Sequence, residues 1–214
     1  AFADPKAYEF IYGRSDKVRR YIGPAYVPIR PQFVDRDYQV REQVQQILVT
    51  TGGGDRENIA GKILEKLGDI ACTIHVISGP YNPHGDRLAR YAQEHPHVVL
   101  HRQVKEMAEL MLQCDLAVTA GGTTVYELCA LGVPFVCFSY AENQEALADY
   151  TGRYGIGLNA GEYHHDPDKT LDNIGRLAAE ATADWQQRRQ MSRRAMELVD
   201  GRGAVRLAEA LIQE

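Results

Sequence analysis

The sequence predicts an α/β fold in which helices cover both faces of a parallel, Rossmann-like β-sheet. Apolar runs rich in β-branched residues alternate with amphipathic helical patterns through the middle of the chain. Several runs are apolar on both faces, which is typical of parallel strands enclosed between two layers of helices. Because each strand pattern is followed by a helical one, right-handed crossovers are expected. The chain has 214 residues, 44% hydrophobic and 25% charged, which is enough for one such core.

The expected elements follow one another in a regular order. Five apolar runs are the expected strands, at residues 46–51, 72–78, 98–101, 116–119 and 134–139. Helical patterns lie between or after them: the stripe Ile59, Ile63, Leu64 and Leu67, the group Met107, Leu110 and Met111, residues 124–131, and a segment that begins near Gln144. After Asp168 we expect only helices, with the arginine-rich stretch 188–194 as a solvated helix face.

The first 40 residues do not fit this alternation. Pro24, Pro28 and Pro31 exclude a regular helix there and predict an extended connector or an edge strand. We therefore expect a connector, the remnant of a preceding domain, over residues 1–40 and a Rossmann-like domain over residues 41–214. Because the chain opens on Ala1 rather than on Met, we expect it to be a piece of a longer protein.

Composition and charge exclude several classes of protein. The formal net charge of −5 removes the basic surface that nucleic acid requires, so no nucleic-acid partner is expected. No apolar run is long enough to span a bilayer or to form a signal peptide, which predicts a cytoplasmic protein. The four cysteines are scattered singly, as reduced core thiols are, and no helix-spaced partner supports the adjacent His164 and His165. We expect neither a metal site nor a cofactor.

Ligands of an open α/β sheet bind beyond the carboxyl ends of its strands, where this sequence places two glycine-rich loops. The first, residues 52–55 (GGGD), lets bare backbone approach a ligand and lets helix-start N–H groups meet an anion. It has neither the Gly-Lys-Ser/Thr of an ATPase loop nor the third glycine of a dinucleotide loop, where Glu57 stands. A tight turn without a ligand is the alternative.

The second loop, residues 119–124 (TAGGTT), combines two glycines with two hydroxyls at a helix start. This combination suits a diphosphate, because its N–H and O–H donors point outward. Glu127 stands three residues after Thr124, so its carboxylate could close a capping box or accept both hydroxyls of a ribose. The sequence leaves both roles open.

Asn143 and Gln144 follow the fifth expected strand. Their amides can bind a polyhydroxylated ligand, although Asn143 could instead be a helix N-cap. The loop at residues 78–83 (SGPYNP) fits a stiff turn or a ligand contact equally well. We expect no catalytic residue in this chain, because it has no GxSxG motif and no cysteine with a recognisable base.

These motifs, taken in order, resemble a known family. The run HRQVKEMAELMLQCDLAVTAGGTTVYELCALGVPFVCFSYAENQ, residues 101–144, resembles the carboxyl-terminal half of GT-B nucleotide-sugar enzymes. It is most similar to the UDP-sugar hydrolases of pseudaminic acid biosynthesis and, more distantly, to the N-acetylglucosaminyltransferases that form lipid II. The loops GGGD and SGPYNP and the connector GPAYVPIRPQF are also similar to those of the hydrolases, so the resemblance covers nearly the whole chain.

The resemblance implies that the chain binds a UDP-sugar through a defined set of residues. Gly53 and Gly54 would lie against the phosphates, Val104 and Met107 would hold the uracil, Gly121, Gly122, Thr123 and Thr124 the diphosphate, Glu127 the ribose hydroxyls, and Asn143 and Gln144 the sugar.

A GT-B enzyme has two Rossmann-like halves, and in the hydrolases the general base is a histidine of the amino-terminal half, which nothing here matches. The resemblance therefore implies that this chain is the UDP-sugar-binding half of a bacterial surface-glycan hydrolase and that the catalytic half is its partner. The alternatives are the donor-binding half of a glycosyltransferase, part of an epimerase, or a module that binds a nucleotide sugar without catalysis.

Overall fold

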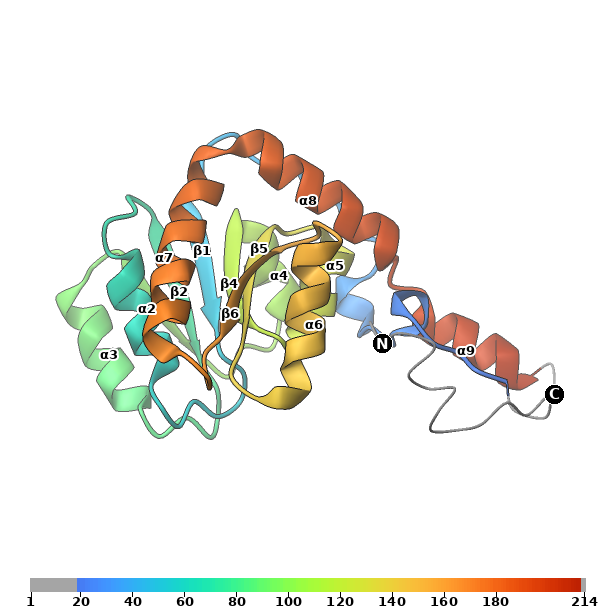
Figure 1. Ribbon diagram of the computed structural model, residues 1–214, viewed down its shortest axis with the longest axis horizontal. Coiled ribbons are helices and arrows are strands. Elements are labelled where there is room, and N and C mark those ends of the chain that lie inside the picture. The colour runs from blue at the N-terminus through green and yellow to red at the C-terminus, as the bar shows by residue number, and fades with distance from the viewer. Residues whose placement is uncertain (1–18, 213–214) are drawn as a thin grey trace.

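A computed structural model describes residues 19–212 and confirms the predicted fold class. Its six strands are β1 (Gln46–Thr50), β2 (Thr73–Ser78), β3 (Val98–Arg102), β4 (Leu116–Ala120), β5 (Phe135–Ser139) and β6 (Leu158–Glu162). They form one sheet in the order β3-β2-β1-β4-β5-β6, and every neighbouring pair is parallel (Figure 1).

Two layers of helices enclose the sheet. One face is covered by α2 (Ile59–Leu67), α3 (Gly85–Glu94) and α7 (Pro167–Ala183), and the other by α4 (Met107–Gln113), α5 (Thr124–Leu131) and α6 (Glu142–Arg153) (Figure 1). In β1, Leu48 belongs to the core under α4 and α5, whereas Ile47 and Val49 belong to the core under α2 and α7. Because all three side chains are fully buried, this strand reads as a continuous apolar run.

The strand order fixes the place of a binding crevice. The chain proceeds outward from β1 to β3 in one direction and from β4 to β6 in the other, so β1 and β4 lie side by side at the reversal. In open α/β sheets ligands bind beyond the carboxyl ends of the strands at such a point. Both glycine-rich loops singled out in the sequence follow these two central strands.

The connector packs onto the domain from residue 19 onward. It contains two short 3-10 turns, η1 (Pro24–Tyr26) and η2 (Pro31–Phe33), each with proline at its first position, as the prolines require. Its side chains Val27, Ile29 and Phe33 are buried in the core under α4 and α5. Of the two alternatives, the edge strand is wrong, because residues 19–40 form no strand and join no sheet.

The last two helices return to the connector. Helix α8 (Trp185–Leu198) crosses the sheet at the amino ends of the strands, and α9 (Gly203–Ile212) extends away beside η1 (Figure 1). A side chain at Gly203 would collide with the main chain of Val27, so glycine permits this close approach. None of the described helices is long and apolar enough to cross a membrane.

Three features differ from the expected elements. The sheet has a sixth strand, β6, which the sequence hides because LNAGE is polar and only Ala160 is buried in it. Helix α3 was absent from the expected helices, and of its ten residues only Leu88 is buried. The expectation of a solvated face at 188–194 is wrong for Arg188, whose side chain is fully buried.

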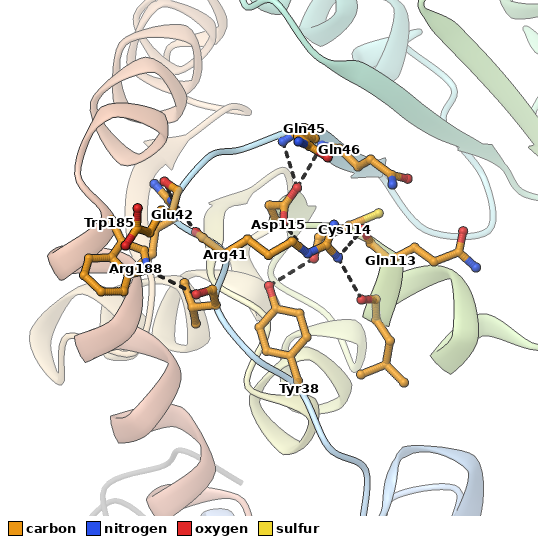
Figure 2. A network of polar contacts seen from close by, with 12 residues as sticks. Tyr38, Arg41, Glu42, Gln45, Gln46, Gln113, Cys114, Asp115, Trp185 and Arg188 are labelled. Atoms are coloured by element: carbon orange, nitrogen blue, oxygen red, sulfur yellow. Dashed lines mark hydrogen bonds and ion pairs between the residues drawn. The ribbon is translucent and has the colours of Figure 1, made fainter.

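Arg188 fastens α8 to the segment that precedes β1 (Figure 2). Its terminal nitrogens donate to four main-chain carbonyl oxygens, those of Ala181 (2.5 Å), Thr182 (2.9 Å), Arg41 (2.8 Å) and Glu42 (2.7 Å). One turn earlier in α8, the indole N–H of Trp185 donates to the carbonyl of Val40 at 3.1 Å.

A buried carboxylate, that of Asp115, continues this network toward β4 (Figure 2). Its Oδ2 accepts the amides of Gln45 (2.8 Å) and Gln46 (2.9 Å), and its Oδ1 lies 3.1 Å from Nε of Arg41. These contacts satisfy main-chain amides at the start of β1, and with those of Arg188 they join the segment before β1, the sheet and α8 into one unit.

The four cysteines are free, as expected for reduced thiols. Cys114, Cys129 and Cys137 are buried, and Cys72 is half-buried. Burial raises the pKa of Cys72 to about 11, so this thiol is a poor nucleophile at neutral pH.

Two histidines form a hydrogen-bonded chain on the sheet. Nδ1 of His75 lies 2.9 Å from Nε2 of His101, and Nε2 of His75 lies 2.8 Å from Oε1 of Gln46. Because the amide oxygen only accepts, His75 carries its proton on Nε2 and accepts from His101 through Nδ1. Burial lowers the pKa of both histidines, and the neighbouring His101 lowers that of His75 further.

Lowering the pH from about 7.5 to about 5 is expected to destabilise the fold through these histidines. Their folded pKa values lie below the ordinary value of 6.5, so the unfolded chain binds more protons between the two values. The contribution of the two neutral histidines to the free energy of unfolding is fully present above about pH 6.5. It decreases as the pH falls toward the folded pKa values. Urea unfolding at a series of pH values measures it.

The double variant His75→Gln/His101→Gln should lose this part of the pH dependence. His97→Gln is the control, because His97 lies outside the hydrogen-bonded chain of His75, His101 and Gln46. Equal pH dependence in the double variant and the wild type would contradict the assignment.

Candidate functional site

The loops after β1 and β2 touch each other beyond the ends of the strands. The amide of Tyr81 donates to the carbonyl of Gly53 at 3.1 Å. A Cβ added at Gly79 would lie 2.5 Å from that same oxygen, so glycine permits the close approach of the two loops. Residues 78–83, where the sequence fits a stiff turn or a ligand contact equally well, thus support the first glycine-rich loop.

The loop after β4 is pressed against the start of α6 in a similar way. A Cβ at Gly121 would lie 3.0 Å from the carbonyl oxygen of Gln144 and 3.2 Å from its Cβ. Across the crevice, the Tyr140 hydroxyl would lie 3.8 Å from a Cβ at Gly52. The loops after β1, β4 and β5 thus converge at one place, as the strand order requires.

Helix α5 presents unused hydrogen-bond donors to this place. The amide of Gly121 donates to the carbonyl of Phe138 in β5 (2.8 Å), and that of Gly122 donates to the carbonyl of Ala120 (2.7 Å). Within the described chain, the amides and hydroxyls of Thr123 and Thr124 donate to no other group. A free helix start of this kind attracts an anion, because its dipole is positive there and its N–H groups are unpaired.

Helix α2, by contrast, already has an anion at its start. The buried carboxylate of Asp55 accepts the amide of Ile59 at 2.7 Å and that of Ala60 at 2.8 Å. The expectation that these helix-start donors meet a ligand's phosphate is therefore wrong. What the first loop offers is the exposed backbone of Gly53 and Gly54.

Glu127 points toward the connector. Its Oε1 accepts from Nε (3.1 Å) and Nη2 (2.8 Å) of Arg30, which lies 97 residues earlier. The capping-box alternative is wrong, because the Thr124 amide does not donate to this carboxylate. The contact with Arg30 leaves Oε2 without a partner in the described chain.

Asn143 and Gln144 lie in the first turn of α6. The N-cap of α6 is Ala141, so the alternative role of Asn143 as an N-cap is wrong. Asn143 is exposed, and Gln144 accepts the Tyr140 amide through Oε1 at 3.2 Å. This bond fixes the Gln144 side chain, and among residues 19–212 its N–H donors have no partner.

Met107 is the first residue of α4 and Val104 lies in the loop before it, and both are half-buried against the core under α4 and α5. The amide of Ala108, one residue after Met107, donates to Oε1 of Gln32 in the connector at 3.1 Å. Sequence reasoning missed Gln32 and Arg30, because nothing local in the sequence shows that η2 contacts α4 and α5.

The structure brings His164 and His165 near Glu145, with one possible ligand atom from each within 4.8 Å of the others. Each histidine also has a carboxylate partner, since His164 contacts Glu145 at 2.8 Å and His165 contacts Glu162 at 2.6 Å. These pairs fasten the turn after β6 to α6 and to the end of its own strand.

The sequence is similar to two named bacterial proteins. It is 29% identical over 220 residues to the spore coat polysaccharide biosynthesis protein SpsG of Bacillus subtilis, covering 100% of this chain and 62% of the relative. It is 27% identical over 124 residues to the pseudaminic acid cytidylyltransferase and UDP-2,4-diacetamido-2,4,6-trideoxy-beta-L-altropyranose hydrolase of Helicobacter pylori, covering 58% of this chain and 22% of the relative. The chain thus spans less than two thirds of the length of these relatives.

Solved structures share the fold at low sequence identity. The glycotransferase of kitacinnamycin matches with a TM-score of 0.62 and 21% identity, over 99% of this chain and 52% of that one. MurG of Acinetobacter baumannii matches with a TM-score of 0.62 and 14% identity, over 84% and 55%. UGT89C1 of Arabidopsis thaliana, complexed with UDP, matches with a TM-score of 0.59 and 14% identity, over 80% and 43%.

The described chain therefore has the architecture of one Rossmann-like half of a GT-B fold. The sequence profile of the glycosyltransferase family 28 C-terminal domain matches residues 46–203, which is most of the chain and includes both glycine-rich loops. The chain belongs to this family.

Proposed function

We propose that this chain is the donor-binding half of an enzyme that acts on a UDP-sugar in the synthesis of a bacterial surface glycan. In this proposal the loop at residues 119–124, here called the α5 loop, binds the diphosphate, and Glu127 accepts the ribose hydroxyls. The uracil lies beside Val104 and Met107, and the sugar lies at Asn143 and Gln144. Gly53 and Gly54 lie opposite the phosphates.

The observation that carries this proposal is the uncapped start of α5 at the crevice. The free amides and hydroxyls of Thr123 and Thr124 in the described chain suit a diphosphate, and the positive end of the α5 dipole complements its negative charge. Glu127, one turn further along the same helix, has a free carboxylate oxygen that can accept a ribose hydroxyl. Donors for a phosphate and an acceptor for a hydroxyl, both on one helix, match a nucleoside diphosphate.

The relatives favour a reaction in which UDP leaves. One is named as a UDP-sugar hydrolase, another as a protein of spore coat polysaccharide synthesis. In the hydrolase version, water attacks the anomeric carbon, the bond from that carbon to the diphosphate oxygen breaks, and UDP departs with the electron pair. The α5 loop stabilises the charge on the departing diphosphate. The proton of the attacking water passes to a base outside this chain, in the amino-terminal half that we propose as its partner.

Sugar transfer is the second candidate, and the family to which the chain belongs favours it. The same donor site serves both reactions, because they differ only in whether water or an acceptor hydroxyl attacks. The full-length protein separates them: UDP released from a UDP-sugar without an acceptor indicates the hydrolase, and release that requires an acceptor indicates the transferase. Binding of UDP without turnover in either assay would indicate a non-catalytic binding module.

UDP is expected to bind the isolated chain with a dissociation constant between about 1 μM and 1 mM. Gly122→Asp should weaken this binding at least about 10-fold, because the new carboxylate would stand beside the diphosphate. The substitution is sterically permitted, since nothing lies within 4 Å of a Cβ at Gly122. Isothermal titration calorimetry measures both values.

Gly68→Asp is the control, because it adds the same charge at the far end of α2. It should bind UDP as the wild type does. No heat of binding up to millimolar UDP in the wild type would refute the proposed function, and equal weakening by both variants would refute the place of the diphosphate.

A further inference from the structure

We propose that Arg30 is a positioning residue for nucleotide recognition, through which the connector sets the carboxylate of Glu127 for the ribose. This inference rests on the proposed function, because it gives Arg30 a role in the nucleotide site proposed above. The family profile begins at residue 46, so Arg30 lies before it.

The geometry of the pair is asymmetric. Two nitrogens of Arg30, Nε at 3.1 Å and Nη2 at 2.8 Å, donate to Oε1 of Glu127, and Oε2 keeps its acceptor capacity. The Glu127 side chain is only 13% exposed, whereas that of Arg30 is 56% exposed. The ion pair therefore holds one oxygen of a nearly buried carboxylate and leaves the other for a ligand.

Arg30 is itself held in place by its own turn. Its guanidinium lies over the ring of Phe33 at 4.9 Å, and that ring is fully buried in the core under α4 and α5. Between the two, Gln32 accepts the amide of Ala108 at the start of α4. One short turn of the connector, η2 with the residue before it, thus contacts both helices that carry the proposed nucleoside contacts.

This arrangement has an energetic consequence for binding. A glutamate side chain that must be ordered on binding costs affinity, and one that is already ordered by Arg30 does not. Coupling is also reciprocal: if a docked connector improves nucleotide binding, then bound nucleotide must stabilise the docked connector. Stabilisation of the docked connector by bound nucleotide distinguishes a positioning role of Arg30 from a merely structural one.

The test compares UDP with 2′,3′-dideoxy-UDP, which lacks the ribose hydroxyls, by calorimetry. Arg30→Ala is expected to weaken UDP binding about 3- to 10-fold and to leave dideoxy-UDP binding unchanged, so that the preference for the ribose hydroxyls falls. Arg30→Lys, which keeps the charge and one donor, should restore part of this preference. Arg36→Ala is the matched control, because Arg36 also joins the connector to a carboxylate, that of Glu109 on α4.

Amide hydrogen exchange provides a second readout. The amides of Phe33 and Val34 close the η2 turn by donating to Arg30 (3.0 Å) and Pro31 (3.1 Å). UDP should slow their exchange in the wild type and in Arg36→Ala, but not in Arg30→Ala.

The outcomes separate the inference from the proposed function. A wild type that does not bind UDP refutes both. If the wild type binds UDP, then three results overturn the role of Arg30 alone: unchanged ribose preference in Arg30→Ala, tighter UDP binding in that variant, or an equal loss in Arg36→Ala. Tighter binding would mean that Arg30 competes with the ribose for Glu127.

Discussion

Replacing Arg188 with methionine is expected to lower the free energy of unfolding by about 3–5 kcal/mol. Methionine fills a similar space but donates no hydrogen bond, so the carbonyls of Ala181, Thr182, Arg41 and Glu42 lose their common donor. These groups surround a fully buried side chain, where water does not replace the lost bonds. Urea unfolding followed by circular dichroism measures the difference.

Arg193→Met is the control for this experiment. Arg193 lies on the same helix, α8, but is exposed, so its loss should change stability by less than about 0.5 kcal/mol. Arg188→Lys should recover part of the stability, because an ammonium group donates to some of the four carbonyls. Equal effects of Arg188→Met and Arg193→Met would show that α8 is not fastened through Arg188.

Replacing Glu127 with alanine is expected to weaken UDP binding about 10- to 100-fold. The carboxylate is the proposed acceptor of the ribose hydroxyls, and hydrogen bonds to a charged group contribute more than neutral ones. The variant also leaves Arg30 without its carboxylate. Calorimetry with UDP measures the loss, and dideoxy-UDP should bind the variant and the wild type with nearly equal affinity.

Glu109→Ala serves as the control, because Glu109 is paired with another connector arginine, Arg36, on a different helix. Its loss removes the same charge and a similar ion pair without touching the proposed ribose acceptor. UDP affinity should stay at the wild-type value. A Glu127→Ala variant that binds UDP as tightly as Glu109→Ala would refute the ribose assignment.

The fold could be predicted from the sequence where burial on two faces leaves an unambiguous pattern. All residues of β4 and β5 are buried, and their apolar runs were identified. Strand β6 could not be predicted in this way, because Gly161, at φ 108°, accompanies an irregular pairing with β5 and its outer residues are half-exposed. A strand at the edge of a sheet need not be apolar, so its composition resembles that of a loop.

The candidate site could be predicted only where residues close together in the sequence form a recognisable pattern. The two glycine-rich loops were identified from glycines and hydroxyls next to strands, and the strand order brings these loops together. The role of Asp55 as the cap of α2 was not predicted, because a capping aspartate and a ligand-binding loop have the same sequence pattern. The contact of Arg30 with Glu127 joins residues 97 positions apart, and no periodicity encodes it.

The contacts of α8 with the connector also determine when the chain can finish folding during its synthesis. Arg188 reaches back 147 residues to Arg41, Trp185 reaches 145 residues to Val40, and Arg206 in α9 donates to the carbonyl of Ala25, 181 residues earlier. The connector therefore leaves the ribosome long before the residues that fasten it exist. Contacts of such long range slow folding, because much of the chain must be ordered before they form. Until α8 has been made, only water can satisfy the main-chain carbonyls of the segment before β1. The domain therefore completes its packing only when α8 and α9 have been synthesised.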